Sequence, residues 1–357
     1  MERKAVGPVL RDISGGSTGK VWYPHTTMSD RKLPTFDELP HFHNYSGCAW
    51  DVWGKDDELG TINLLTEDVV KNAAGEIKLG KCISLNWPIN FPERPFYKRQ
   101  TPIINSWRKS DVVNDDSISI NTQSGSQWDG LKHYGIAEHK VFYNNTPSDA
   151  LYRGHVSIPD PEKVNPEMMK LGIHNWAKHG ICGRGVLVDL VSYFESGGSP
   201  LPYDPWSSHS VELKDILACA KKQGVEFRLG DILILRVGFI RRYSSSSLEE
   251  RLSFHGKPET FAGLEQTEDM KRFLWNNHFA AVASDQPALE RYPPPQGPLH
   301  LHQTLLPLFG MPIGELFDLE ALAKFCAESG RYTFFFSSWP LNILGGVASP
   351  PNAAAYF

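Results

Sequence analysis

The stretch GVLVDLV, residues 185–191, decides the fold class of this chain, because it has the composition of a buried β-strand. The segment ELKDILACAKKQGV (212–225) follows with helical spacing of its apolar residues, and that helix is expected to end at Gly224. A second β-rich run, GDILILRVGF (230–239), comes next. The order strand, helix, strand predicts an α/β fold.

The surrounding sequence repeats this order. TEDMKRFLWNNHFAAVASD (267–285) and DLEALAKFCAESGRYTFFFSSW (318–339) each read as a helix followed by an apolar strand. TEDVVKNAAGEIKLGKCISLNW (66–87) reads as a helix capped by Thr66, a glycine break and a short strand. The start is rich in Gly, Pro, Ser and charge, so residues 1–45 are expected to form an extended arm before a single domain, 46–357.

Composition excludes several classes of protein. The 357 residues are 41% hydrophobic and 22% charged, as in folded proteins with a sizeable core. A net charge of -5 gives no reason to expect nucleic acid or an anionic membrane as a partner, so a small molecule is expected. No stretch approaches the ~20 apolar residues of a membrane span. The five scattered cysteines form no Cys-x-x-Cys pair, which favours reduced thiols and a cytoplasmic location.

A first candidate site lies in NTQSGSQWDGLKHYG (121–135). The preceding SISINT (117–122) alternates like a strand, and Gly125 and Gly130 allow sharp turns, so the polar side chains should cluster where a strand feeds a loop. These side chains are Gln123, Gln127, Asp129 and His133. The alternative is an ordinary polar loop, in which Asp129 caps a following helix and His133 lies on the surface.

A second candidate segment is PLHLHQTLLPLFGMPIGELFDLEAL (298–322). It places His300 and His302 before an apolar, helix-like run, and Glu315 in an apolar setting after a Gly-Met-Pro-Ile-Gly turn. A carboxylate in such surroundings needs a partner. The alternative is that Glu315 and Asp318 are acids at the N-terminus of a helix, where they complement its dipole.

Together the two segments resemble the cyclase superfamily, which includes bacterial kynurenine formamidases and isatin hydrolases. Its signature, His-x-Gly-Thr-His-x-Asp-x-Pro-x-His, overlays QSGSQWDGLKH (123–133), and the family's downstream histidine and glutamate fall on His302 and Glu315. WGKDDELGTINLLT (53–66) and the Ala-Ser-Asp at 283–285 also match. The resemblance extends from about Trp50 to the end. The signature residues in step are Gly125, Ser126, Asp129 and His133.

The departures from the signature concern the metal. The two signature histidines, which bind a divalent metal in metal-dependent members, are Gln123 and Gln127 here, and the signature proline is Leu131. An amide is a poor metal ligand beside imidazole. We therefore expect no metal cofactor. If one is bound, the resemblance implies a single Zn²⁺ or Mn²⁺ on Asp129, His302 and Glu315. The exchanged residues resemble a fungal-type branch of the family.

The resemblance also implies a fold and a chemistry. The fold is an α/β fold with a mixed, barrel-like β-sheet and flanking helices, assembled as a homodimer or higher homo-oligomer. The implied catalytic residues are Asp129 and His133 as an acid/base pair and Glu315 as a base, together with His302. Gln123 and Gln127 would donate hydrogen bonds to an oxyanion or substrate carbonyl. Four tryptophans suggest a flat pocket for an aromatic or polyketide-like metabolite, namely Trp50, Trp53, Trp107 and Trp128.

Three functions stay open on the sequence. The first is a metal-independent cyclase, dehydratase or isomerase of secondary metabolism. The second is a metal-assisted amide or lactone hydrolase of the arylformamidase kind. The third is a non-catalytic protein that binds a small molecule. Retention of all four catalytic candidates argues against the third.

Overall fold

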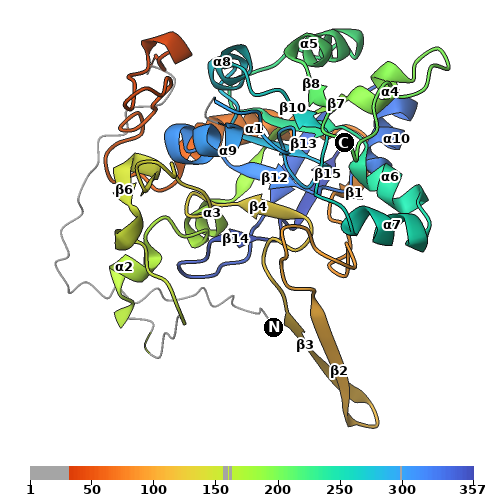
Figure 1. Ribbon diagram of the computed structural model, residues 1–357, viewed down its shortest axis with the longest axis horizontal. Helices are drawn as coiled ribbons and strands as arrows, with labels where there is room; N and C mark the ends of the chain where they lie inside the picture. Colours follow the sequence, from red (N-terminus) through yellow and green to blue (C-terminus); the bar gives the residue numbers. More distant parts are fainter. Residues whose placement is uncertain (1–31, 156–159, 161–162, 298–299) are drawn as a thin grey trace, which may run out of the picture. The chain divides into compact units, whose positions relative to one another are not determined.

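The structure is a computed structural model and describes residues 32–155, 160, 163–297 and 300–357. Residues 1–31, most of the predicted N-terminal arm, lie outside the described residues. Pro34–Phe357 form one compact unit. It contains a curled, nine-stranded mixed sheet in the order β1-β15-β13-β7-β9-β11-β12-β4-β14, with helices around it (Figure 1). This is the predicted mixed α/β fold.

The elements have the following bounds in the described part of the chain. The strands of the large sheet are β1 (Cys82–Ser84), β4 (Gln127–Asp129), β7 (Ile181–Asp189), β9 (Ile232–Arg236), β11 (Ala281–Ser284), β12 (Ile313–Glu315), β13 (Thr333–Ser338), β14 (Ala348–Ser349) and β15 (Ala353–Tyr356). The paired strands outside it are β2 (Ile103–Ser110), β3 (Val113–Ser119), β5 (Val141–Phe142), β6 (Thr146–Pro147), β8 (Ser210–Val211) and β10 (Gly263–Leu264). The α-helices are α1 (Glu67–Ala74), α2 (Pro166–Met169), α3 (His174–His179), α4 (Leu190–Phe194), α5 (Leu213–Lys222), α6 (Phe239–Ser245), α7 (Leu248–His255), α8 (Glu268–Asn276), α9 (Leu301–Thr304) and α10 (Glu320–Ser329).

The predicted β-α-β unit is confirmed. Strands β7 and β9 pair in parallel, with Gly185 opposite Ile232, and α5 lies between them in sequence. Strand β11 extends the parallel part on the other side of β9 after α8. The side chain of Thr66 caps α1 by accepting a hydrogen bond from the backbone N–H of Val69. No helix in the described part of the chain has both the length and the apolar character needed to cross a bilayer.

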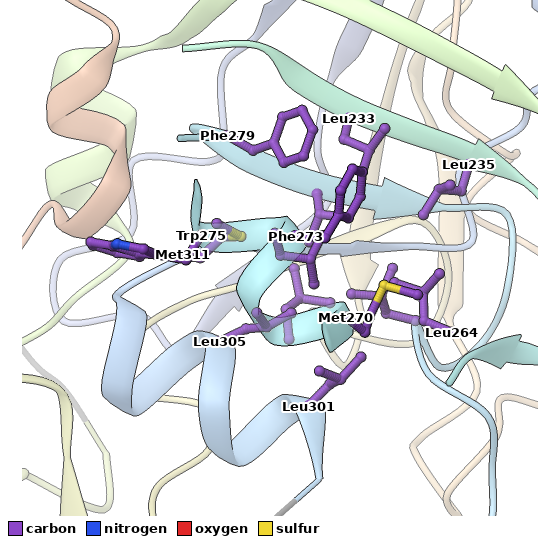
Figure 2. Packing of buried hydrophobic residues seen from close by; sticks show 14 of the residues in the cluster. Leu233, Leu235, Leu264, Met270, Phe273, Trp275, Phe279, Leu301, Leu305 and Met311 are labelled. Carbon is purple, nitrogen blue, oxygen red and sulfur yellow. The ribbon is translucent and has the colours of Figure 1, made fainter. Parts of the chain in front are cut away.

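The main core lies between the parallel strands and the helices packed against them. Figure 2 shows Leu233 and Leu235 of β9 packed near Phe273 of α8, with Leu301 and Leu305 from the segment that follows His300. Every residue of β9 is buried, as expected for a central parallel strand covered on both faces. The same packing positions the segment of His302 beside the sheet.

The first candidate segment departs from the prediction. Residues 127–129 form strand β4 of the large sheet, between β12 and β14, rather than part of a loop. The predicted strand over 117–122 is observed in part, because β3 ends at Ser119. Strands β2 and β3 form a hairpin in which all eight residues of β2 are exposed. This hairpin connects Arg99, just before β2, to Gln123, just after β3.

Candidate active site

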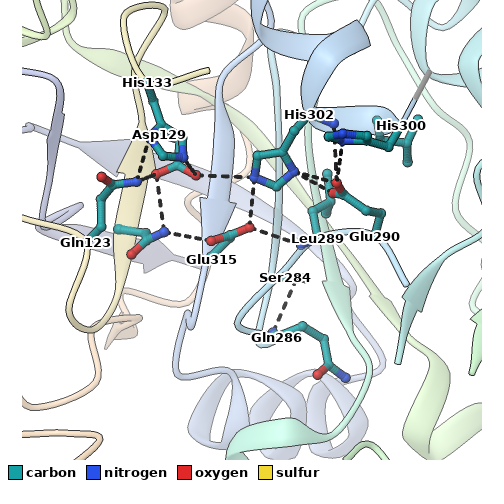
Figure 3. Close-up of polar contacts among 12 residues, drawn as sticks. Gln123, Asp129, His133, Ser284, Gln286, Leu289, Glu290, His300, His302 and Glu315 are labelled. Atoms are coloured by element: carbon teal, nitrogen blue, oxygen red, sulfur yellow. Dashed lines mark hydrogen bonds and ion pairs between the residues drawn. The ribbon is translucent and has the colours of Figure 1, made fainter. Parts of the chain in front are cut away.

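Polar side chains from β4 and the turn that follows it, from β12 and from α9 come together on one face of the β4–β12 pair (Figure 3). Strand β4 supplies Asp129, and β12, its antiparallel partner, supplies Glu315. His302 comes from α9, and His133 follows β4 in the sequence. The structure therefore brings together all four side chains that the sequence analysis named as catalytic.

Strand β4 directs alternate residues to opposite sides. Gln127 and Asp129 face the polar cluster. Trp128 faces the core, is 0% exposed, and donates a hydrogen bond from Nε1 to Ser338 Oγ at 2.9 Å. The predicted contact of Trp128 with a substrate is corrected accordingly, because a strand cannot direct three successive side chains to one face.

The glycines of this segment are needed because neighbouring backbone approaches them closely, and not because the chain turns there. Neither Gly125 nor Gly130 has a positive φ. A Cβ at Gly125 would lie 2.7 Å from the carbonyl oxygen of Phe91, and one at Gly130 would lie 2.5 Å from that of Val347. Both positions therefore require glycine because neighbouring backbone packs directly against them.

Asp129 accepts hydrogen bonds from both glutamines through one oxygen. Gln123 Nε2 lies 2.7 Å from Oδ1, and Gln127 Nε2 lies 3.2 Å from it. The other oxygen, Oδ2, is buried and has no hydrogen-bond partner among the described residues; it lies 3.6 Å from His302 Nε2 and 3.8 Å from His133 Nε2. Burial opposes ionisation, but His133 and His302 outweigh it and lower the pKa of Asp129 to about 2. Asp129 is therefore an anion at neutral pH.

Glu315 lies on strand β12, so it is not the helix N-terminal acid that was the alternative prediction; α10 begins only at Glu320. Its Oε2 accepts a hydrogen bond from Gln127 Nε2 at 2.6 Å, and its Oε1 accepts one from the backbone N–H of Leu289 at 3.1 Å. Burial, and next the negative charge of Asp129, raise the pKa of Glu315 to about 7. Glu315 therefore exchanges a proton near neutral pH.

His302 is held by a residue that the sequence analysis missed. Its Nδ1 lies 2.6 and 2.7 Å from the two carboxylate oxygens of Glu290, which directs Nε2 toward Asp129 and Glu315. Burial opposes protonation of His302, but the adjacent carboxylates of Glu290, Asp129 and Glu315 raise its pKa well above the usual value. The sequence offered one signal for Glu290: it is an acid placed directly after the apolar pair Ala288 and Leu289.

The proton of His133 has a defined position. Gln123 Nε2 lies 3.1 Å from His133 Nδ1, and an amide nitrogen only donates hydrogen bonds. Reversing the amide would place its oxygen against Asp129 Oδ1, so the orientation is set by Asp129. Burial lowers the pKa of His133 and keeps the ring neutral. His133 is therefore the tautomer whose proton is on Nε2.

A cavity of about 390 Å³ opens onto this cluster. Its walls combine three tyrosines and a proline with the charged groups. The lining residues are Tyr97, Arg99, His133, Tyr134, Ala288, Glu290, Tyr292, Pro294, His300, His302 and Glu315. None of the four tryptophans predicted to form a flat pocket lines it. Trp50 donates a hydrogen bond to Pro307, and Trp107 lies in the exposed hairpin; Trp53 is half-buried elsewhere.

Asp129, His133 and His302 each offer one ligand atom, and these three atoms lie within 4.8 Å of one another. A carboxylate oxygen and two imidazole nitrogens form a suitable donor set for Zn²⁺ or Mn²⁺. The protonation of these residues does not suit a metal, however. Gln123 donates a hydrogen bond to Nδ1 of His133, so the proton of that ring is on Nε2, the nitrogen that would otherwise bind the metal. Gln127 likewise presents its N–H groups to the carboxylates. The residues present therefore do not fit a three-ligand metal site in this arrangement.

Comparisons with known proteins agree with the predicted family. Residues 35–291 match the family described as "Putative cyclase". A crystal structure described as that of a novel cyclase has 32% sequence identity, covers 87% of this chain and 99% of its own, and has a TM-score of 0.73. Isatin hydrolase A from Ralstonia solanacearum, at 13% identity over 77% of this chain and 91% of its own, shares the fold with a TM-score of 0.51. No curated protein is significantly similar. The chain belongs to the cyclase family.

Proposed function

We propose that this chain is an enzyme that moves a proton at a carbonyl compound, in a cyclisation, dehydration or isomerisation, with Glu315 as the base. One observation carries the proposal: Glu315 lines the cavity with a pKa raised to about 7, beside an imidazole held by a second carboxylate. A base whose pKa lies near the working pH is the most effective. Asp129, with its pKa lowered to about 2, stays ionised at neutral pH and is too weak a base for this role.

The protonation states of the neighbouring residues indicate their roles. Neutral His133 lines the cavity and carries its proton on Nε2, so it is a hydrogen-bond donor for negative charge that develops on a substrate oxygen. His302, as an imidazolium between carboxylates, offsets the charge of Asp129 and Glu315. The glutamines position the two acids and do not reach the cavity themselves.

The cavity walls favour a planar substrate. Tyr97, Tyr134 and Tyr292 surround it with aromatic surface, and a volume of about 390 Å³ suits a small metabolite. These tyrosines take the part that the sequence analysis gave to tryptophans. The proposed substrate class therefore stays aromatic or polyketide-like.

A second candidate, metal-assisted hydrolysis of an amide or lactone, is favoured by the unpaired Oδ2 of Asp129 facing His133 and His302. It requires that Gln123 release Nδ1 of His133, so that the proton can move off Nε2. Elemental analysis of the purified protein separates the two candidates.

The test combines a substrate panel with one substitution and a matched control. Planar aromatic ketones, amides and lactones are incubated with the protein and followed by mass spectrometry. Dehydration loses one water, hydrolysis gains one and isomerisation leaves the mass unchanged. Glu315→Gln is expected to lower kcat by at least about 100-fold. Glu328→Gln, the same change on an exposed face of α10, is expected to have no effect. Full activity of Glu315→Gln would refute the role of Glu315.

A further inference from the structure

Arg99 is a charged residue of the cavity to which neither the signature nor the proposed chemistry gives a task. Among the described residues that line the cavity, it is the one arginine or lysine. Its Nη1 donates to the backbone oxygen of Gln123 at 2.8 Å and to Oε1 of Gln127 at 3.3 Å. The guanidinium lies 5.0 Å from the centre of the Tyr97 ring. Three contacts therefore hold it at the edge of the site.

The remaining donors of Arg99 are free within the described part of the chain. Only Nη1 hydrogen-bonds to a described residue, and no carboxylate oxygen of such a residue lies within 4.0 Å of the guanidinium. Two buried arginines differ in this respect. Arg184 directs Nε and Nη2 at both oxygens of Asp231, and Arg236 does the same to Glu320. Arg99 instead donates hydrogen bonds only to neutral oxygens. Its remaining guanidinium N–H groups pair with no carboxylate of a described residue.

An arginine fork beside a cavity is well matched to a carboxylate, which it binds with two parallel hydrogen bonds. The cavity otherwise presents Glu290 and Glu315, with Asp129 behind them, and these repel anions. The imidazolium of His302 is already paired with these carboxylates, so Arg99 is the cation that remains to pair with an entering anion. The aromatic walls at Tyr97 and Tyr292 suit a planar body attached to that anion.

We propose that Arg99 binds a carboxylate of the substrate and that the substrate is a planar aromatic acid, an inference that rests on the proposed function of this site. Gln127 links this binding to the chemistry. Its Oε1 accepts from Arg99 while its Nε2 donates to Glu315, so one amide connects the anion-binding group to the base. Arg99 determines specificity, whereas Glu315 reacts.

The test measures the binding of two probes by calorimetry, without turnover. Benzoate carries the carboxylate, and benzyl alcohol has the same ring without charge. Wild-type protein is expected to bind benzoate more tightly than benzyl alcohol. Arg99→Gln is expected to weaken benzoate binding by about tenfold or more and to leave benzyl alcohol binding unchanged. Arg94→Gln, the same change at an exposed residue, should alter neither affinity.

Two outcomes would overturn the proposal: no preference for benzoate in the wild type, or an unchanged preference in Arg99→Gln. If Arg99→Gln loses both ligands, Arg99→Lys decides, because lysine keeps the charge. A retained preference for benzoate in Arg99→Lys supports the proposal, and its loss contradicts it. Glu315→Gln separates this inference from the proposed function, since it should lower kcat by at least about 100-fold while keeping the preference for benzoate. Full activity of Glu315→Gln refutes only the proposed function.

Discussion

The side-chain amide of Gln127 donates a hydrogen bond to Oε2 of Glu315 across 2.6 Å. The two residues are direct partners on the antiparallel strands β4 and β12, so the contact is part of the sheet itself. The same nitrogen lies 3.2 Å from Oδ1 of Asp129. An amide thus bridges two buried carboxylates at a position where metal-dependent members of the superfamily have a histidine, and it reduces the repulsion between the acids.

Asp129→Asn is expected to lower kcat by at least about 100-fold, because it removes the anion that faces His133 and His302. The folded state favours the ionised form of Asp129, with its pKa lowered to about 2. Its neutral replacement should therefore lower the free energy of unfolding by about 2 kcal/mol, without preventing folding. Steady-state kinetics and thermal unfolding of the purified variant check both effects. Asp116→Asn, on the exposed strand β3, is the control. Retained turnover, or a protein that no longer folds, would contradict this prediction.

Wild-type protein purified without added metal is expected to contain well under one equivalent of Zn or Mn, and a chelator should leave turnover unchanged. The physical reason is that both glutamines present N–H donors to the acids, where a metal would require lone pairs. Even the loss of a group that only supports a ligand lowers metal affinity by about 10 to 100-fold. Stoichiometric metal together with chelator-sensitive turnover would instead support the hydrolase candidate.

The converse change should create a metal site. Gln123→His combined with Gln127→His restores the two signature imidazoles and frees His133 Nδ1 from its amide donor. We expect this double variant to bind about one equivalent of Zn²⁺, measured by elemental analysis after dialysis. Adding Asp129→Asn should abolish that binding. A double variant that stays free of metal would show that features other than the two glutamines exclude it.

Trp128→Phe separates packing from substrate contact. Because Trp128 is fully buried and bonded to Ser338, the change should lower the free energy of unfolding by about 1 to 3 kcal/mol in denaturant titrations. Benzyl alcohol affinity should stay the same. Tyr134→Ala, which truncates a cavity wall, should show the opposite pattern of weaker binding and a smaller loss of stability. Weaker binding in Trp128→Phe alone would argue for the contact predicted from the sequence.

Asp285 makes stability depend on pH. Burial raises its pKa to about 7, although its oxygens accept hydrogen bonds from the backbone N–H groups of Val237 and Gly238. The folded state therefore binds this proton more tightly than the unfolded chain, and stability falls as pH rises from about 4 to about 7, by at most about 4 kcal/mol. Unfolding of wild type and Asp285→Asn at pH 5 and pH 8 should show a smaller difference in the variant. Equal differences would contradict the assignment.

The fold was predictable where local patterns and long-range packing agree. Local patterns predicted three features: the apolar run of β7, the helical spacing of α5 and the cap at Thr66. Each pattern can be recognised within one short segment of sequence. Strand β4 lacked such a signal, because its three residues read Gln-Trp-Asp and became a strand only through pairing with β12 and β14. Short, polar strands are specified by their partners, which the chain order does not reveal.

The site was predictable in part for a related reason. Asp129, His133, His302 and Glu315 were singled out from two polar segments and given their roles by resemblance to a family, and the structure places them together. Glu290 and Arg99 were missed because their roles depend on neighbours 12 and 24 residues away in sequence. The tryptophans misled because a large aromatic side chain fills a core as readily as it lines a pocket.

The two sides of strand β4 have different functions: one fixes the strand in the core and the other supplies polar groups to the site. Ser126 and Trp128 anchor it in the core through Leu316 and Ser338, whereas Gln127 and Asp129 point toward the cavity. A substitution at 127 can therefore alter the chemistry without disturbing the anchors. Such a strand allows a lineage to replace its reactive groups one at a time, each step passing through a folded protein. The side of β4 that faces the site can thus change while the side that fixes it in the sheet stays the same.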